Sequence, residues 1–307
     1  MGNALQVSIV KITGDSMRSA QSVPDLLAIE EPLEIRLAYG GAEAGQPGSL
    51  SGGAVAGKMQ NLAVTMRTPG HDADLALGFL FTEGIIAGGQ DVEAVEHVFL
   101  PCSENRQNTI MITLKEGVVP NLRQAERNFY TTSSCGVCGK ASIEAIRTVS
   151  AFGSGKFEAQ EKEGIDPAFI LGLPEQLARE QEVFAETGGL HAAALFEING
   201  SLLLVREDVG RHNAVDKLIG AAMMEGRLPL RQSMLLLSGR ASFELVQKAA
   251  MAGIPVIAAV GAPSSLAVSL AEEFGTTLIG FLRDNRFNIY SGMHRVNMPV
   301  AELKKSL

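Results

Sequence analysis

The chain has 307 residues, a length that corresponds to one large domain or two unequal ones. Its 34 acidic and 26 basic side chains give a formal net charge of -8 at pH 7, which excludes an overall positive field that would hold nucleic acid or an anionic membrane surface. Hydrophobic residues make up 46% of the chain and charged residues 20%, so a compact globular protein is expected rather than a disordered one.

Cysteine usage and the N-terminal residues indicate the compartment. Three cysteines are too few for a disulfide framework, and the first residues have neither the basic flank nor the apolar stretch of a secretory signal. The longest apolar runs, 75–81 and 254–262, are much shorter than the roughly 20 residues of a membrane-spanning helix. We therefore expect a cytoplasmic protein with these runs in its core.

The N-terminal part combines irregular segments with short β-prone runs. Residues 13–27 and 40–57 are rich in Gly, Ser and Pro without periodicity, so we predict a flexible arm over 1–27 and a flexible loop at 40–57. Residues 28–130 are predicted to form a small α+β domain.

Strands and one helix are expected inside this small domain. Apolar residues alternate or cluster at 33–39, 62–66 and 109–114, which predicts strands. A helix is expected to begin at Asp72, whose carboxylate would cap it, and to end near Glu83.

A Cys-x-x-Cys pair, Cys135 and Cys138, is the sharpest feature of the chain. It precedes a stretch with apolar residues at helical spacing, so we place it at a helix N-terminus, where unpaired N–H groups and nearby Lys140 favour the thiolate. Glycines at 136 and 139 keep this loop unobstructed. The pair is therefore predicted to be nucleophilic.

Three other interpretations of the dithiol remain open. The cysteines could be buried small hydrophobic residues, two ligands of a zinc site, or a thioredoxin-like redox pair. The neighbouring serines and glycines argue against burial, and no second paired motif supplies further zinc ligands. Cys102 has no neighbouring partner in the sequence and is expected to be an ordinary thiol.

The middle of the chain contains two candidate groups. His191 precedes a strand expected at 192–196, and another strand is expected at 202–206, after a looser acidic stretch at 156–182. Segment 207–217 packs charged and amide side chains around a glycine before an amphipathic helix. It is either a solvated charged turn with Asn213 as a helix cap, or a helix start with Arg211, His212 and Asn213 directed at an anion.

The last quarter has a β-α-β-α-β pattern. Buried strands are predicted at 234–237, 256–260 and 276–282, with helices from 242 to 252 and from 263 to a stop at Gly275. Strands separated by such helices predict a sheet with parallel neighbours and helices on its faces, within a larger α/β domain over 131–307.

Two anion-binding segments follow strands of this pattern. Ligands collect beyond the carboxyl ends of strands in open α/β sheets. Segment 238–240 follows the first strand, and segment 281–286 ends the last, where Arg283 and Arg286 could hold phosphate and Asn285 is expected to adopt a left-handed turn.

These residues carry a resemblance to a known family. The strings SSCGVCG at 133–139, RTPG at 67–70, LALGFL at 75–80, EGII at 83–86, EDVGRHNAVDK at 207–217 and SGR at 238–240 closely resemble the formate dehydrogenase accessory sulfurtransferase family, FdhD. The match runs from about residue 30 to 292.

The resemblance implies a sulfurtransferase of molybdenum cofactor biosynthesis. Such a protein takes persulfide sulfur from a cysteine desulfurase and passes it to the molybdenum or tungsten bis-guanine-dinucleotide cofactor of formate dehydrogenase. Cys135 would carry the persulfide and Cys138 would assist or resolve it. The cofactor-binding residues implied by the resemblance are Phe281, Leu282, Arg283, Asp284, Asn285 and Arg286, with no permanent metal.

The resemblance also implies a homodimer and a cytidine-deaminase-like, three-layer fold for the larger domain. That fold raises a zinc deaminase as an alternative, with His191, Cys135 and Cys138 as ligands. Ala193 stands where the deaminase glutamate is required, which argues against it. A chaperone that holds the cofactor without covalent sulfur transfer is the other alternative.

Overall fold

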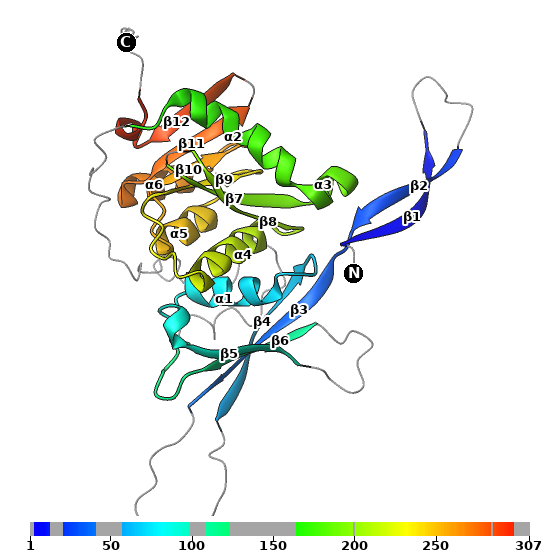
Figure 1. The fold of residues 1–307 in the computed structure, drawn as a ribbon, viewed down its shortest axis with the longest axis vertical. Coiled ribbons are helices and arrows are strands. Elements are labelled where there is room, and N and C mark those ends of the chain that lie inside the picture. Colours follow the sequence, from blue (N-terminus) through cyan, green and yellow to red (C-terminus); the bar gives the residue numbers. More distant parts are fainter. Residues whose placement is uncertain are drawn as a thin grey trace, which may run out of the picture. The chain divides into compact units, whose positions relative to one another are not determined.

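The computed structural model describes residues 3–12, 21–40, 57–98, 108–122, 164–198, 200–283 and 285–297 (Figure 1). It is a mixed α/β fold, as predicted. The chain forms two compact units, the first made of Met1–Thr148, Gln181–His191 and Arg206–Arg227 and the second of Val149–Glu180, Ala192–Val205 and Leu228–Leu307. The sequence predicted one boundary after residue 130, whereas the chain passes between the units several times.

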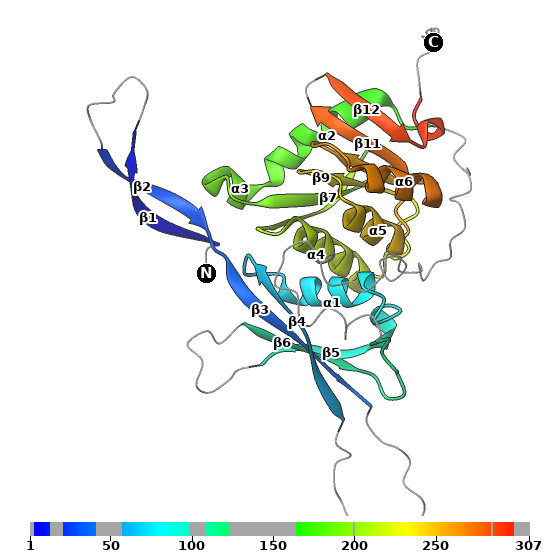
Figure 2. The same cartoon turned by 180° about the vertical axis from the view of Figure 1, so that it is seen from behind.

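The N-terminal residues form a two-stranded antiparallel sheet of β1 (Ala4–Lys11) and β2 (Gln21–Ala28). The prediction of a flexible arm is therefore wrong for the described residues of 1–27. Figure 2 shows this ribbon with α3 (Glu182–Thr187) beside β2. Leu5, Val7 and Ile9 alternate with polar residues, a strand pattern that the Gly- and Ser-containing residues around it obscured.

The first unit also contains a four-stranded sheet in the order β4-β3-β6-β5. The predicted strands are confirmed as β3 (Glu31–Tyr39), β4 (Lys58–Arg67) and β6 (Thr109–Leu114). β5 (Val92–His97) was not predicted, because its glutamates interrupt the apolar pattern, and a short 3-10 turn, Gly89–Asp91, precedes it. Leu33, Ile35 and Leu37 bury the same face of β3, as the two-residue period of a strand requires.

Two helices of the first unit, α1 (Asp72–Thr82) and α4 (Arg211–Met224), pack against each other. Glycines make the approach close. A Cβ atom on Gly78 would lie 1.9 Å from the backbone oxygen of Asp216, and one on Gly220 would lie 1.9 Å from that of Asp74. Asp72 is not the cap of α1: His71 holds that position, with φ of 56°, and the Asp72 carboxylate is buried against Arg67.

The second unit is built on a six-stranded sheet in the order β12-β11-β10-β9-β7-β8. The strands are β7 (His191–Glu197), β8 (Leu202–Asp208), β9 (Ser233–Leu237), β10 (Val256–Ala259), β11 (Thr277–Arg283) and β12 (Arg286–Ser291). β10 pairs in parallel with both β9 and β11, which confirms the predicted parallel neighbours. β7 and β12 are antiparallel to β9 and β11.

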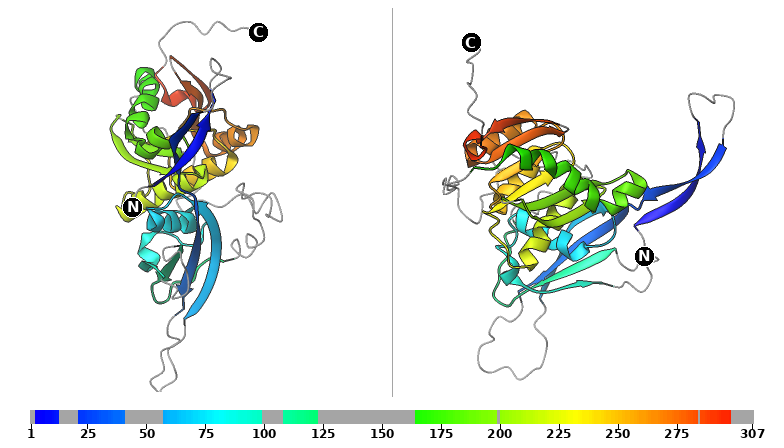
Figure 3. Two further views of the ribbon diagram at one scale, coloured as in Figure 1. Left: turned by 90° about the vertical axis from the view of Figure 1, so that its right-hand side faces the viewer. Right: turned by 45° about the horizontal axis from the view of Figure 1, so that its top comes forward.

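Helices cover both faces of this sheet (Figure 3). The predicted helices are confirmed as α5 (Phe243–Met251) and α6 (Ser265–Phe274), and Gly275 ends α6 with φ of 67°. On the other face lies α2 (Pro167–Glu180), inside the stretch that the sequence analysis treated as loose. Its Ile170, Leu173 and Leu177 are buried against the strands, at the spacing of one helix face.

Two further features complete the fold. A short 3-10 turn, Met293–Arg295, follows β12. Among the helices of the described part of the chain, none combines the length and the apolar character needed to cross a membrane. The layers of helix, sheet and helix in the second unit agree with the predicted three-layer domain.

Candidate functional site

The residues that follow β9, β10 and β11 lie side by side at the carboxyl edge of the second unit's sheet. The Gly261 N–H donates to the Gly239 oxygen at 2.9 Å, and the Phe281 N–H donates to the Gly261 oxygen at 3.0 Å. Segment 238–240 and the end of β11 are therefore held two strands apart at one edge. Such an edge is where open α/β sheets bind ligands.

The predicted cofactor segment 281–286 forms the tip of the β11–β12 hairpin at this edge. Arg283 and Arg286 are both exposed and lie opposite each other in the register of the two strands, whereas Leu282 is buried. The Arg283 guanidinium carbon is 5.9 Å from the centre of the Phe281 ring. Like charges that face each other across a hairpin repel, so a bound anion would offset the repulsion between these two arginines.

The backbone of this segment differs from the prediction at one residue. Among the described non-glycine residues, only His71 and Phe281 have a positive φ, so the left-handed residue is Phe281, at 52°, and not Asn285. The strand register shifts between Gly280 and Arg283, so the pairing of β11 with β12 is irregular there. Strained backbone of this kind is concentrated at functional sites. Asn285 is exposed, and Asp284 lies outside the described residues.

The predicted dithiol has no described position in the structure. Cys135, Cys138 and Cys102 all lie outside the described residues. Their predicted roles, including the zinc-ligand alternative, stay predictions. In the described part of the chain, no three His, Cys, Asp or Glu side chains gather as a metal site.

In segment 207–217, Asp208 and residues 213–217 are buried and the others are half-buried, so the prediction of a solvated charged turn is wrong for the buried ones. Asp208 is 0% exposed and Lys217 1%. Asn213 does not cap α4, because Gly210 holds that position. The Asn213 amide instead donates to the Met66 oxygen at 2.8 Å and to Asp208 at 3.0 Å.

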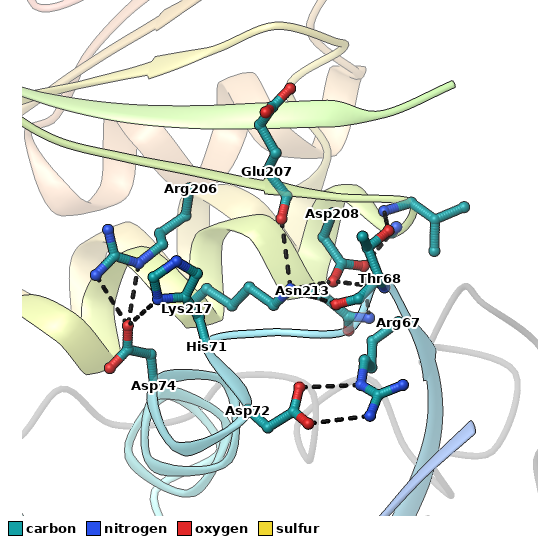
Figure 4. Close-up of polar contacts among 12 residues, drawn as sticks. Arg67, Thr68, His71, Asp72, Asp74, Arg206, Glu207, Asp208, Asn213 and Lys217 are labelled. Atoms are coloured by element: carbon teal, nitrogen blue, oxygen red, sulfur yellow. Dashed lines mark hydrogen bonds and ion pairs between the residues drawn. The ribbon is translucent and has the colours of Figure 1, made fainter. Parts of the chain in front are cut away.

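Asp208 is the centre of a buried polar network, drawn in Figure 4. Its carboxylate lies 2.7 Å from Lys217 Nζ and accepts hydrogen bonds from the backbone N–H groups of Thr68 and Gly210. Lys217 also donates to the Thr68 backbone oxygen at 2.8 Å. The partners of segment 207–217 are therefore residues of the RTPG segment, some 140 positions earlier in the chain.

Other charged side chains around this network are also paired. Arg67 is 1% exposed and forms two hydrogen bonds with Asp72, at 2.9 and 3.0 Å. Arg206 binds Asp74 at 2.9 Å. Burial acts to raise the pKa of Asp74, but hydrogen bonds from His71 and Arg206 outweigh it, so this pKa lies below its ordinary value.

His191 and Arg211 form a second, more exposed group in the first unit. Burial lowers the pKa of His191, and the charges of Arg211 and His212 lower it further, partly opposed by Asp208. The Arg211 Nε atom is buried and has no hydrogen-bond acceptor among the described residues. The environment is positive, but whether Arg211 and His212 meet an anion stays a prediction.

The sequence thus pointed correctly to the exposed Arg283 and Arg286. Segment 207–217 was interpreted from its local composition alone. The buried pairings of Arg67 and Thr68 were missed. The partners of Thr68 lie 140 and 149 positions away, beyond any local signal, whereas Asp72 is five positions from Arg67 and was instead interpreted as a helix cap. The sequence hint that comes nearest to predicting burial of segment 207–217 is its mixture of positive and negative charges together with the apolar pattern of the helix that follows.

The chain is similar in sequence to known proteins. The family model described as the FdhD/NarQ family matches residues 54–297. A protein of Mycolicibacterium paratuberculosis named sulfur carrier protein FdhD is 51% identical over 289 residues, covering 93% of this chain and 97% of that protein. A protein of the same name from Streptomyces avermitilis is 48% identical over 280 residues, covering 91% of each chain.

A solved structure shows the same fold. The crystal structure of a protein described as a formate dehydrogenase accessory protein, from Desulfotalea psychrophila, superimposes with a TM-score of 0.65 at 22% identity, covering 96% of this chain and all of that one. Because the family model matches most of the chain and the relatives share about half of its residues, the chain belongs to the FdhD/NarQ family.

Proposed function

We propose that this protein is a sulfur carrier that takes persulfide sulfur from a cysteine desulfurase and transfers it to the molybdenum bis-guanine-dinucleotide cofactor required by formate dehydrogenase. The observation that carries the proposal is the Cys-x-x-Cys pair in a chain whose relatives are named sulfur carrier protein FdhD over about nine tenths of its length. The family resemblance supplies the donor, the acceptor enzyme and the cofactor.

The first step is a thiol exchange at Cys135. The Cys135 thiolate attacks the outer sulfur of the donor's persulfide, the donor S–S bond breaks, and the donor leaves as a thiolate. Cys135 then carries the sulfur as Cys-S-SH. A lowered thiol pKa, expected at a helix N-terminus, supplies the thiolate for this attack.

The second step releases the sulfur at the oxidation level of sulfide. The Cys138 thiolate attacks the inner sulfur of Cys135, the outer sulfur leaves as HS⁻ and becomes the terminal ligand of the metal, and a Cys135–Cys138 disulfide forms. Two electrons from the thiols reduce the transferred sulfur. A cellular thiol reductant then has to restore the dithiol, which suits a reducing cytoplasm.

The exposed edge of the second unit is the proposed cofactor site. Arg283 and Arg286 would hold the nucleotide phosphates, since a guanidinium presents paired N–H donors to phosphate oxygens. The neighbouring residues Phe281, Leu282, Asp284 and Asn285 would complete the segment. We also propose a homodimer, as the resemblance implies.

Intact-mass measurement tests the proposal. After incubation with a cysteine desulfurase and cysteine, the protein should gain the mass of one sulfur atom, and Cys135→Ala should abolish the gain while Cys102→Ala should not. If Cys135→Ala still supports formate dehydrogenase maturation, the protein acts as a chaperone instead. Stoichiometric zinc in the purified protein would favour the deaminase-like alternative.

A further inference from the structure

Arg240 lies at the same sheet edge as the proposed cofactor segment but belongs to a different loop. It follows β9, is exposed, and has no ion pair among the described residues. A Cβ atom on Gly261 would lie 3.0 Å from both the Cα and the Cγ of Arg240. The stem of Arg240 therefore lies across Gly261, in space that only a glycine leaves open.

This placement puts Arg240 near the end of β11. The strand order is β9-β10-β11, and Gly261, which follows β10, accepts the hydrogen bond of the Phe281 N–H at 3.0 Å. Gly261 therefore contacts Arg240 and is hydrogen-bonded to Phe281, so Arg240 lies one loop away from the hairpin tip and its two arginines.

The backbone around Arg240 is held in place on the side of the following helix. Ala241 pairs with Pro263 in an isolated parallel bridge, and the Ser264 N–H donates to the Ala241 oxygen at 3.0 Å. Pro263 in turn approaches β11 closely, since a Cβ atom on Gly280 would lie 2.7 Å from its Cδ. The loops after β9 and β10 and the end of β11 thus form one connected backbone unit.

Three arginines gather at this edge without an acidic partner among the described residues. Arg240, Arg283 and Arg286 are all exposed, and no ion pair joins any of them to an acidic side chain within the described ranges. One phosphate group is well satisfied by two guanidinium groups. A third guanidinium reaching the edge from the neighbouring loop fits a ligand with two linked phosphates.

We infer that Arg240 is a third arginine of this anion site and holds the diphosphate of a nucleotide together with Arg283 and Arg286. The inference rests on the proposed role of this edge in cofactor binding. It extends the site to Arg240 in the loop after β9, and it explains why position 261 is a glycine.

Calorimetric titration with GDP and GMP tests the inference on the purified full chain. Arg240→Ala should weaken GDP binding by about tenfold or more, as expected for loss of one charge-assisted contact, and should weaken GMP binding much less. Gly261→Ala should also weaken GDP binding, because the new methyl group displaces the Arg240 stem. Arg231→Ala is the matched control: Arg231 is exposed and precedes β9, at the opposite end of that strand, so GDP binding should not change.

The outcomes separate this inference from the proposed function. If Arg240→Ala binds GDP as the wild type does while Arg283→Ala loses binding, Arg240 is not part of the site but the cofactor edge stands. If the wild type binds neither nucleotide, the proposed edge fails and the inference fails with it. Equal losses of GDP and GMP affinity in Arg240→Ala would contradict the diphosphate assignment.

Discussion

Asp208 and Lys217 form a buried ion pair whose other hydrogen-bond partners are protein groups. Both side chains are at most 1% exposed, and they also form hydrogen bonds with backbone groups of Thr68, Glu207 and Gly210 and with the Asn213 side-chain amide. Removing one member of such a pair leaves an uncompensated buried charge, which costs more than the pair itself contributes.

Replacing Lys217 with methionine should therefore lower the free energy of unfolding by about 3–5 kcal/mol, measured by urea denaturation. Lys115→Met, at an exposed position, should change it by less than about 0.5 kcal/mol. Adding Asp208→Asn to Lys217→Met should restore part of the loss. A loss below about 1 kcal/mol in the single variant, as in exposed pairs, would show that the pair does not stabilise the fold.

His191 gives a pH-dependent prediction. Burial and the charges of Arg211 and His212 lower its pKa in the folded protein relative to the unfolded chain. Its contribution to stability is therefore complete above the unfolded pKa near 6.5 and is lost as the pH falls from there toward the folded pKa, since only the unfolded chain gains the proton.

NMR titration of the His191 ring protons should show this lowered pKa directly. Arg211→Ala should raise the His191 pKa, whereas Arg211→Lys, which keeps the positive charge, should leave it lowered. An unchanged pKa in Arg211→Ala would mean that the charge of Arg211 does not contribute to the shift.

The contact between α1 and α4 depends on two glycines. Helix propensity alone predicts that Gly→Ala in a helix stabilises by about 0.5–1 kcal/mol. At Gly78 and Gly220 the added methyl would meet a backbone oxygen of the facing helix at 1.9 Å, which is too close for any side-chain rotation to relieve.

Gly78→Ala and Gly220→Ala should each lower the free energy of unfolding by about 1–3 kcal/mol or more, the usual cost of overpacking. Gly172→Ala in α2 is the control, because its nearest atom to a new Cβ is a flexible glutamine nitrogen at 3.9 Å. That variant should be neutral or stabilised in thermal unfolding. A stabilised Gly78→Ala would contradict the close helix approach.

The whole molecule is proposed to combine two separable activities. Sulfur loading belongs to Cys135, and nucleotide binding belongs to an edge of the second unit that rests on its own core of α2 and the sheet. Because Arg283 and Arg286 are exposed, their removal should not disturb that core.

The double variant Arg283→Ala/Arg286→Ala should accept sulfur from a desulfurase like the wild type while losing GDP binding. Cys135→Ala should show the reverse. Mass spectrometry and calorimetry on the same preparations check both. Loss of sulfur loading in the double arginine variant would show that the two sites depend on each other.

Local patterns were sufficient for much of the fold. The strands β3, β6, β9, β10 and β11 and the helices α1, α5 and α6 were predicted. β3 and the helices carry apolar residues at the period of their own backbone, and β9, β10 and β11 are continuous apolar runs. β1 and β2 were missed because nearby Gly and Ser residues led to the prediction of a flexible arm. α2 was missed because charged residues surround its narrow apolar face.

The sequence by itself determined the family, the exposed arginines of segment 281–286 and the nucleophilic dithiol as a candidate. Only the tertiary structure decided that Asp208 and Lys217 are buried against Thr68, and that the loop carrying Arg240 lies at the same sheet edge as Phe281. The physical reason is distance along the chain. Periodicity and composition describe neighbours within one element, whereas a buried charge and a shared ligand edge depend on residues that meet only after the sheets and helices have packed.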